Sequence, residues 1–309
     1  MIKTTLIQEE SALWLKGNLH CHSTISDGRV TPEGIAEGYA RKGYDFLAIT
    51  DHDIFMSHDE IPEELIITLP AMELTGPITE DKNGHFGVIQ KGQAGEFSQG
   101  QRFALKSREE TIDFLKAHHE NYLLILNHPY WSLLEWEEVM DLPYLNALEI
   151  YNHATQMGDF VGEATHFWNT LQRKGKYLWG VAADDSHNRM TNVPGWPFDT
   201  KFTDSLGGWV CVKAKERSRE AITEALETGS FYASTGPEIY DFYIQDNMFY
   251  VKCSPCQRIV VSGDRGYFQR KIGESLVEFS GQLKGKEKFL RVQCADERGG
   301  VAYSNPIYI

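Results

Sequence analysis

Residues 13–22 read LWLKGNLHCH. A β-rich run forms the first part of this stretch, and two histidines close it. His20 and His22 are two residues apart, so on a regular strand both imidazoles point to the same side and can hold one ion. The stretch therefore predicts a strand with metal ligands at its carboxyl end.

Short β-rich runs of this kind alternate with helix-period segments from about residue 13 to residue 234. Such alternation is typical of a parallel sheet or an α/β barrel. The predicted strands are Leu13–Leu19, Asp45–Thr50, Leu65–Glu73, Tyr122–Asn127, Ala147–Tyr151, Tyr177–Ala183 and Trp209–Val212.

Several helices between these strands have readable ends. Thr31 predicts an N-cap, followed by Pro32 at the first helical position. Residues 107–110 and 132–135 both match the capping box, in which Ser and Glu satisfy amide donors at a helix start. Gly175 predicts the end of a helix that begins near residue 159.

The helical period disappears after residue 234. Residues 238–309 read as short alternating strands separated by Gly- and Asp-rich turns, which favours a small antiparallel sandwich. We therefore predict two domains, an α/β barrel at 1–234 and a small all-β, immunoglobulin-like domain at 235–309.

Composition excludes several classes of partner. The chain has 309 residues, 41% of them hydrophobic, and a formal net charge of 30 − 44 = −14. This acidity argues against duplex nucleic acid or an anionic membrane as a partner. The N-terminus lacks an apolar segment of signal-peptide length, and no run approaches the roughly 18 apolar residues of a membrane span. We expect a cytoplasmic protein.

Five cysteines are scattered along the chain, which fits reduced thiols better than a disulfide framework. Cys253-Ser-Pro-Cys256 is a lone CxxC motif in a β-rich segment. We interpret it as structural, and a redox or zinc motif is the alternative.

Metal-ligand side chains gather at the ends of the predicted strands, where α/β barrels carry their reactive groups. Imidazole and carboxylate together suit zinc, iron or manganese better than calcium. A lone His-x-His is often only a polar strand end. Metal-ligand residues at the ends of several predicted strands, however, together predict a multinuclear metal centre. The candidate ligands are His20, His22, Asp27, His52, Glu73, His85, His128, Asp185 and His187, with His85 placed in a loop.

Other polar residues follow the same strand ends. Three carboxylates could orient ligand imidazoles, or could be solvated or helix-capping groups: Asp51, Glu149 and Asp184. Four side chains could bind a phosphate ester, and surface or packing roles are equally open for them: Arg29, Tyr130, Asn152 and Arg189.

The metal-ligand motifs together resemble the PHP (polymerase and histidinol phosphatase) superfamily across residues 14–234. The motifs are Asn18–His22, Thr50–Asp53, Glu73, Asn127–Pro129 and Asp185–His187. The tail, with Phe231–Pro237 and Ala302–Pro306, is similar to the CehA/McbA-like branch of these metallohydrolases.

The resemblance implies a distorted seven-stranded (β/α) barrel that holds two or three divalent ions, Zn, Mn or Fe. It assigns the ligands to three ions. The first would take His20, His22, Glu73 and Asp185; the second Glu73, His85 and His128; the third Asp27, His52 and His187. Glu73, Asp185 and His187 are the residues expected to act in catalysis.

The expected activity is hydrolysis of a small phosphate ester, with nucleotides among the candidates, by attack of a metal-bridging hydroxide. A carbamate or carboxyl-ester hydrolase with the same metal centre is the first alternative. A non-catalytic, metal-dependent binding protein is the second. The C-terminal domain is expected to contact the barrel or to mediate self-association.

Overall fold

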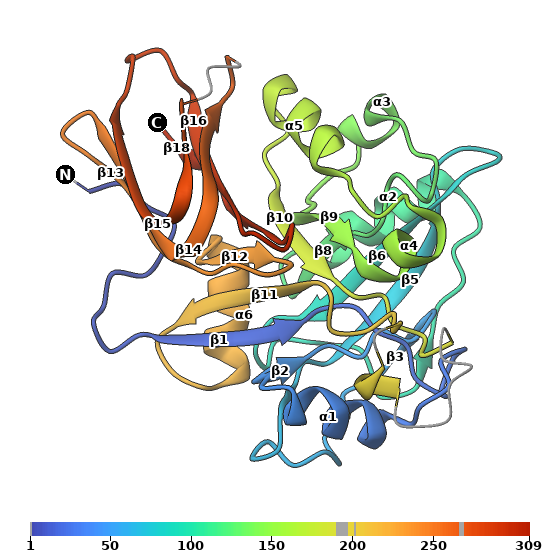
Figure 1. Ribbon diagram of the computed structural model, residues 1–309. Coiled ribbons are helices and arrows are strands. Elements are labelled where there is room, and N and C mark those ends of the chain that lie inside the picture. Colours follow the sequence, from blue (N-terminus) through green and yellow to red (C-terminus); the bar gives the residue numbers. More distant parts are fainter. Residues whose placement is uncertain (1, 190–196, 201, 266–268) are drawn as a thin grey trace.

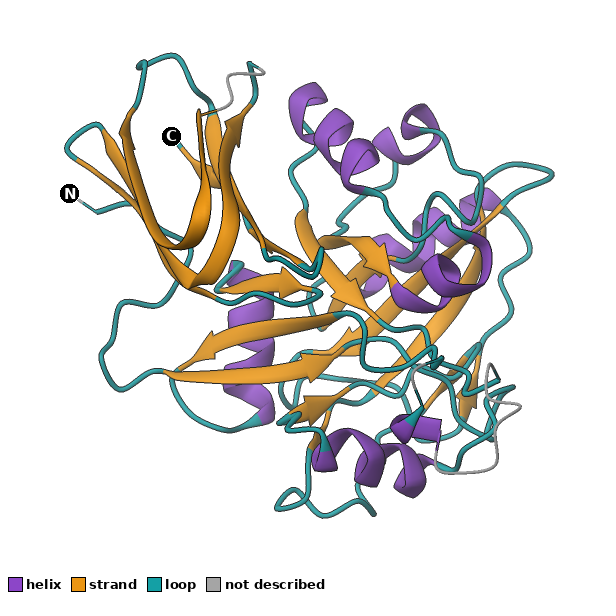
Figure 2. Ribbon diagram, in the orientation of Figure 1, coloured by secondary structure: helices purple, strands orange, loops and turns teal. Residues whose placement is uncertain are grey.

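The computed structural model describes residues 2–189, 197–200, 202–265 and 269–309. Their strands form three hydrogen-bonded sheets of eleven, five and two strands. Helices flank the two larger sheets (Figures 1 and 2). The fold is thus mixed α/β, as the sequence predicts.

The largest sheet spans the molecule. Its strands follow the order β13 (Ile239–Gln245), β14 (Met248–Gly263), β16 (Phe289–Ala295), β17 (Val301–Ser304), β12 (Phe231–Ser234), β11 (Trp209–Ala214), β1 (Leu13–Asn18), β2 (Phe46–Leu47) and β4 (Ile67–Thr68). Two further strands join it at its C-terminal end: β15 (Gln269–Gln282) on β14 and β18 (Ile307–Tyr308) on β16.

The second sheet has the order β10 (Trp179–Ala183), β9 (Ala147–Asn152), β8 (Tyr122–Leu126), β6 (Asn83–Gln90) and β5 (Ala71–Pro77). A small sheet pairs β3 (Ile54–Phe55) with β7 (Gln101–Arg102). The helices are α1 (Pro32–Arg41), α2 (Arg108–His118), α3 (Trp136–Met140), α4 (His153–Asp159), α5 (Thr165–Lys174), α6 (Arg219–Thr228) and the 3-10 turn η1 (Pro197–Asp199).

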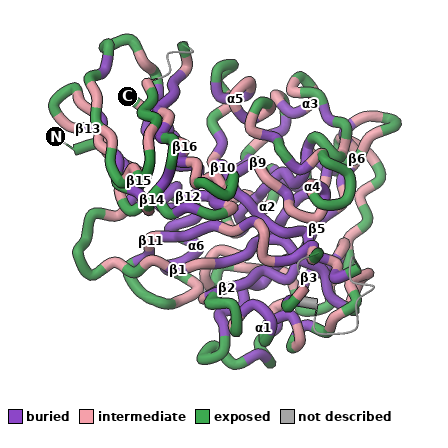
Figure 3. The backbone as a smooth tube through the Cα atoms, in the orientation of Figure 1, coloured by how far each residue is buried: buried purple, intermediate pink, exposed green. Residues whose placement is uncertain are grey.

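Strands of the two large sheets share one apolar core, which gives the N-terminal part a barrel-like interior. Leu15 and Phe46 from one sheet contact the same buried cluster as Ile125 and Val181 from the other. β2, β8 and β10 are buried over most of their length and β1 over half of it, in keeping with the buried interior of Figure 3. Apolar burial of this extent is the main force that holds the two sheets together.

A closed seven-stranded barrel is not confirmed. Among the described residues, no ladder joins β4 to β5 or β10 to β11, so the ring of strands stays open at two places. Strand direction explains part of this departure. β1 pairs antiparallel with β11, and β6 pairs antiparallel with both of its neighbours, which interrupts the parallel order of an α/β barrel.

A separate C-terminal sandwich is not confirmed either. β12 pairs with β11 on one side and with β17 on the other, so one sheet runs across the predicted boundary at residue 234. β14 pairs with β13 through residues 248–253 and with β16 through residues 258–263. The change of partner occurs at irregular register, where a strand can turn a corner. The division into domains stays a prediction.

Most helix starts agree with the sequence. Thr31 accepts a hydrogen bond from the backbone N–H of Gly34 at the start of α1, and Ser107 and Ser218 cap α2 and α6 in the same way. The left-handed residue Gly175, with φ of 95°, ends α5.

Three local predictions are wrong. α5 begins at Thr165 and not near residue 159, because residues 153–159 form the separate helix α4, which ends at the left-handed residue Phe160 with φ of 59°. α3 begins at Trp136 and is capped by Glu135, because the Glu135 and Glu138 side chains form the reciprocal box one turn later than predicted. His85 lies on strand β6 and not in a loop, since residues 83–90 form a hairpin with β5.

No helix in the described ranges has both the length and the apolar content needed to cross a lipid bilayer.

Asn305 fastens the C-terminal end to the N-terminal sheets. Its Oδ1 accepts from the Gly180 N–H at 2.9 Å, and its Nδ2 donates to the carbonyls of Gly229 and Phe231 at 3.2 Å each. We expect Asn305→Ala to lower the free energy of unfolding by about 3 kcal/mol, because three buried main-chain groups lose their partner. Urea denaturation would measure this loss. Asn83→Ala, at an exposed asparagine, is the control, and equal stability of the two variants would contradict the prediction.

Candidate metal centre

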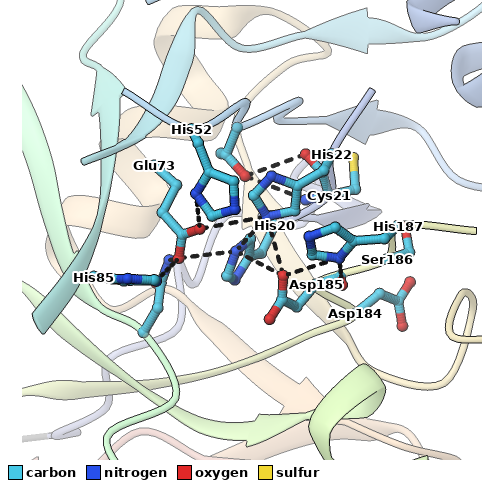
Figure 4. A network of polar contacts seen from close by, with 12 residues as sticks. His20, Cys21, His22, His52, Glu73, His85, Asp184, Asp185, Ser186 and His187 are labelled. Carbon is cyan, nitrogen blue, oxygen red and sulfur yellow. Dashed lines mark hydrogen bonds and ion pairs between the residues drawn. The ribbon is translucent and has the colours of Figure 1, made fainter. Parts of the chain in front are cut away.

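The candidate ligands converge at one end of the sheets. His20 and His22 follow β1, Glu73 lies within β5, and His128 comes two residues after β8. Asp185 comes two residues after β10. Figure 4 shows the imidazoles and carboxylates pointing toward one another from these separate elements.

The backbone turns sharply where two of these ligands stand. Asp185 has φ of 55° and His128 has φ of 23°, both in the left-handed region that residues other than glycine rarely adopt. Isolated parallel bridges tie His52 to Glu73 and Cys21 to Ser186. The chain thus accepts local strain that aims the side chains at a common point.

Glu73 is the centre of the group, and its buried carboxylate contacts five imidazoles. Its Oε1 lies 3.1, 3.2 and 3.5 Å from nitrogens of His20, His128 and His85. Its Oε2 lies 3.2 and 3.4 Å from nitrogens of His52 and His22. The two oxygens therefore face different sets of histidines, as a bridging carboxylate requires.

Asp185 completes the buried side of the cluster. Its Oδ1 lies 3.0 Å from His22 Nε2 and 3.2 Å from His20 Nε2. Potential ligand atoms of His20, His22, Glu73 and Asp185 all lie within 4.8 Å of one another. This set is the one that the family resemblance assigns to the first ion.

A second set lies closer to solvent. Potential ligand atoms of Asp27, His52 and His187 lie within 4.8 Å of one another and of His22. His187 Nε2 is 3.3 Å from Asp27 Oδ1, and the Asp27 side chain is 37% exposed. The resemblance assigns Asp27, His52 and His187 to the third ion.

Between these two sets lies a third group of potential ligands, which differs slightly from the set expected for the second ion. His52, Glu73 and His85 offer ligand atoms within 4.8 Å of one another. His128 reaches the same carboxylate oxygen as His85, so the residues expected at a second ion are also neighbours.

The carboxylates control protonation of the buried imidazoles. Burial opposes a charged His20, but Asp185, Glu73 and Glu149 outweigh burial and raise its pKa well above the ordinary value. The same balance raises the pKa of His22 to about 9 and also raises that of His128. These shifts favour the protonated form of the three imidazoles when no cation is bound.

The histidines nearer to solvent behave in the opposite way. Burial lowers the pKa of His52 to about 4, against the attraction of Glu73. Burial and the neighbouring His22 lower the pKa of His187. Neutral imidazole is the form that binds metal ions, so these two residues are ready ligands at neutral pH.

Unsatisfied polar atoms show that the residues fit a group of divalent ions. His22 Nδ1, His85 Nδ1, Glu73 Oε2 and Asp185 Oδ1 are buried and accept or donate no hydrogen bond within the chain. Such buried atoms need a partner, and imidazole with carboxylate is a typical donor set for Zn, Mn or Fe.

Glu149 holds two ligands in place. Its Oε1 lies 3.0 Å from His20 Nδ1, and its Oε2 accepts from the His128 N–H at 2.7 Å. Asn152 Nδ2 donates both to Glu149 and to Asp185 Oδ2, so this amide supports the carboxylates.

The other two predicted supporting carboxylates bind backbone and hydroxyl groups. Asp51 accepts from the N–H and hydroxyl groups of Ser23 and Ser26, which shapes the turn after His22. Asp184 accepts from three consecutive N–H groups of residues 206–208 and from the Tyr39 hydroxyl. Burial raises the pKa of Asp184.

Two supporting residues were not among the candidates predicted from sequence. Asn127 Nδ2 donates to Glu73 Oε1 at 2.9 Å, and Ser132 Oγ lies 3.1 Å from His128 Nδ1. The signal for Asn127 was its place beside His128 at a strand end. The sequence around Ser132 matches a capping box, so Ser132 was interpreted as a helix cap and not as a contact of the His128 imidazole.

A cavity of about 450 Å³ opens onto the cluster. Its walls include Arg189, Trp131 and all the candidate ligands except His20 and His22. Arg189 Nη2 also contacts Asp27 Oδ2 at 2.7 Å. Arg29 Nη1 lies against the carbonyl of Arg189, and the exposed Tyr130 lines a different cavity.

Comparisons with known proteins give one likeness that covers nearly the whole chain and one that covers a short segment. No protein-family model matches the chain. A segment of 42 residues is 48% identical to the DNA polymerase/3'-5' exonuclease PolX of Bacillus subtilis (strain 168). This match covers 14% of the chain and only 7% of the relative, so it says nothing of most of that protein.

Solved structures cover more of the chain. A two-domain protein of Bacteroides vulgatus ATCC 8482, described as containing a predicted PHP-like metal-dependent phosphoesterase, matches over 97% of both chains with a TM-score of 0.51 and 16% identity. An amidohydrolase of Chromobacterium violaceum matches over 55% of this chain and 87% of its own, with a TM-score of 0.40 and 14% identity. At these identities the first likeness shows the fold alone, and the second is too weak to support an argument.

Metal binding is expected to release protons. The buried imidazoles with raised pKa must lose their protons before a divalent cation can bind. Calorimetric titration of the metal-free protein with Zn²⁺ at pH 7, in buffers that differ in ionisation enthalpy, should show a net release of about one proton or more per chain. A binding enthalpy that does not depend on the buffer would contradict this.

The same shifts predict how pH affects the stability of the metal-free protein. A histidine with a raised pKa stabilises the fold fully below its unfolded pKa of about 6.5. This contribution is lost as the pH rises through about 9, the pKa of His22. Thermal unfolding in a chelator should therefore show a lower Tm at pH 9.5 than at pH 6.5. A rise in Tm across this window would contradict it.

Glu149→Gln is expected to weaken metal binding about 10- to 100-fold, because the charged acceptor behind His20 becomes neutral. Competition with a fluorescent zinc chelator would measure the affinity. Glu163→Gln is the control, since Glu163 is an exposed glutamate outside the cluster whose carboxylate accepts from the Tyr303 hydroxyl. Equal affinities in the two variants would show that Glu149 does not tune the centre.

Proposed function

We propose that this protein is a metal-dependent phosphoesterase of the PHP type that hydrolyses a small phosphate ester, with nucleotides among the candidates. One observation carries the proposal: a single buried carboxylate, Glu73, is surrounded by five imidazoles. Asp185 stands on the far side of the same cluster. This donor set has more ligands than one ion needs, which supports two or three ions.

Residues of the chain would hold these ions in three groups. His20, His22, Glu73 and Asp185 would hold the first; Glu73, His85 and His128 the second; Asp27, His52 and His187 the third. Divalent ions in such a centre supply activation of water and neutralisation of charge on the phosphoryl group.

Glu73 and Asp185 position the ligand groups. Because each carboxylate oxygen of Glu73 faces its own set of imidazoles, the side chain fixes the separation of neighbouring ligand groups. Asn127 and Asn152 donate to the two carboxylates and limit their rotation. A fixed donor set lowers the reorganisation needed when charge develops on the substrate.

His187 stands at the boundary between cluster and cavity. Its Nδ1 lies 2.9 Å from the backbone carbonyl of Asp185, which makes Nδ1 the protonated nitrogen and leaves Nε2 unprotonated toward Asp27. Its lowered pKa keeps the ring neutral at pH 7. His187 can therefore serve as an ion ligand or accept a proton beside the substrate.

Cavity size and lining favour a small substrate. A volume of about 450 Å³ lies within the range of small-molecule sites. Trp131 presents an aromatic surface next to His85 and His128, with ring centroids 6.2 and 5.1 Å away. Such a surface suits an ester with a planar group such as a nucleobase.

A carbamate or carboxyl-ester hydrolase with the same centre is the second candidate. Among the described residues that line the cavity, Arg189 is the one Lys or Arg, and its guanidinium is engaged by Asp27. A cavity with few free cations favours an ester that carries less negative charge than a phosphate monoester.

We extend the proposal to the binding partners and the cellular location of the protein. The net charge of −14 supports a small-molecule substrate over duplex nucleic acid or a membrane. The five free, buried cysteines are consistent with the reducing cytoplasm. Self-association and membership of the CehA/McbA-like branch remain proposals.

The activity test uses protein reconstituted with Mn²⁺, Zn²⁺ or Fe²⁺. p-Nitrophenyl phosphate, bis-p-nitrophenyl phosphate and nucleotides should be hydrolysed, and a naphthyl carbamate should not. Asp185→Asn and His22→Ala should each lower kcat/KM by about 1,000-fold or more, because each removes a buried ligand. His119→Ala, at a histidine outside the cluster, is the control.

Three outcomes would contradict the proposal. Turnover of the carbamate alone would favour the second candidate function. Full metal occupancy without turnover of any ester would favour a metal-dependent binding protein. Near-normal rates of Asp185→Asn at matched metal content would remove Asp185 from the site.

A further inference from the structure

Three cysteines meet in the core of the C-terminal strands, far from the Glu73 cluster in sequence. Cys253 and Cys256 lie on β14, and Cys294 lies on β16. The three side chains are buried, and their sulfur atoms all lie within 4.8 Å of one another. The Sγ atoms of Cys253 and Cys256 are 3.7 Å apart.

An irregular stretch of β14 brings Cys253 and Cys256 to the same face of the strand. Residues three apart on a regular strand point to opposite faces, so Cys253 and Cys256 would normally diverge. The register of β14 against β15 shifts between Lys252 and Cys256 and again before Arg258. A bulge adds a residue to one strand and re-aims the side chains that follow, so both cysteines face the core.

Cys294 enters the group from the neighbouring strand. It pairs with Ile259 across the ladder between β14 and β16, just beyond the irregular region. Its partner on the other side is Ala302 of β17, whose small side chain leaves room for sulfur. The third thiol therefore depends on the same change of strand partner that bends β14.

Sulfur separations fit a shared ion. Zinc–sulfur bonds of about 2.3 Å at a tetrahedral angle place two sulfurs roughly 3.8 Å apart. The 3.7 Å between Cys253 and Cys256 matches this value. A disulfide would need a much shorter separation of about 2.05 Å.

A fourth donor stands beside the thiols. The carbonyl oxygen of Leu276 lies 3.3 Å from Cys256 Sγ and 3.8 Å from Cys253 Sγ. A tetrahedral ion shared by sulfur and oxygen sets a spacing of about 3.6 Å between them. A polar cavity of about 480 Å³, lined by Cys256 and Asp296 among others, provides a route from solvent.

We propose that Cys253, Cys256 and Cys294 form a second metal site, a three-thiolate site for one soft d10 cation, Zn²⁺ or Cu⁺. Thiolate ligands select these ions, whereas imidazole and carboxylate ligands suit the harder ions of the Glu73 cluster. The carbonyl of Leu276 completes the coordination shell. The ion compensates the charge of thiolates that are removed from water.

Cys211 shows what a cysteine without this role looks like in the same core. It is buried in the same apolar cluster, on β11, but does not belong to the group of converging sulfurs. A single buried cysteine behaves as a small apolar side chain. Cys211→Ser therefore provides a control that places a similar hydroxyl in the same core without removing a ligand.

The test is a Co²⁺ titration of reduced, metal-free, full-length protein under anaerobic conditions. Cobalt bound to thiolates gives an intense sulfur-to-metal charge-transfer absorption in the near ultraviolet, which nitrogen and oxygen ligands do not give. We expect the intensity of this absorption at saturation to correspond to about one sulfur-bound Co²⁺ per chain, in addition to the Co²⁺ that the Glu73 cluster binds. It should persist in Asp185→Asn, since the Glu73 cluster contributes no sulfur. Competition with Zn²⁺ and with Cu⁺ identifies the preferred ion.

Variants locate the signal. Cys253→Ser, Cys256→Ser and Cys294→Ser should each abolish or strongly weaken the charge-transfer band, whereas Cys211→Ser should keep it. Failure of one serine variant to fold does not decide the matter, because the wild-type titration stands by itself. No sulfur-to-metal band with Co²⁺ and no uptake of Cu⁺ in fully reduced wild-type protein would overturn the proposal. Retention of the band in all three variants would do so as well.

Discussion

Burial of the Glu73 carboxylate is the constraint on which the rest of the structure depends. An ionised carboxylate removed from water is costly unless charged or hydrogen-bonding groups surround it. Five imidazoles and the Asn127 amide meet that need here, and they come from separate strands and loops. The strand ends must therefore converge, with protons on some imidazoles when cations are absent. The pKa shifts run in opposite directions because Asp185 and Glu73 together outweigh burial at His22, whereas burial outweighs the attraction of Glu73 at His52.

The scaffold meets the constraint without a closed barrel. The ladder is open on both sides of the second sheet in the described residues, yet the two sheets share a continuous apolar core. Glu149 adds a polar link, since it contacts both the ring of His20 and the backbone of His128. Packing and such polar links hold the ligand-bearing ends together, and the hydrogen-bonded ring is dispensable. The left-handed turns at His128 and Asp185 place the side chains that a straight strand would misdirect.

Much of the candidate site could be predicted from sequence because its signals are local. His20 and His22 share a strand face by their spacing alone, and Thr31 marks a helix start by its side chain alone. Strand pairing is different, because it depends on partners far along the chain. β6 was missed since Gly84 and Gly87 weaken its strand pattern, and pairing with β5 and β8 overrides this. The same non-local pairing carries β11 into the C-terminal sheet, where sequence favoured a separate sandwich.

The C-terminal cysteines show how such non-local pairing changes the interpretation of a motif. On sequence alone Cys253 and Cys256 form a lone CxxC pair, and a structural role was favoured because no second pair follows. The bulge in β14 and the neighbouring strand supply what the motif lacked, a third sulfur from Cys294. A thiolate group favours soft or borderline ions such as Cu⁺ and Zn²⁺, whereas a nitrogen- and oxygen-rich cluster also accepts Mn and Fe. One chain can therefore offer two chemically distinct sites, and the ligand type sets the range of ions that each accepts.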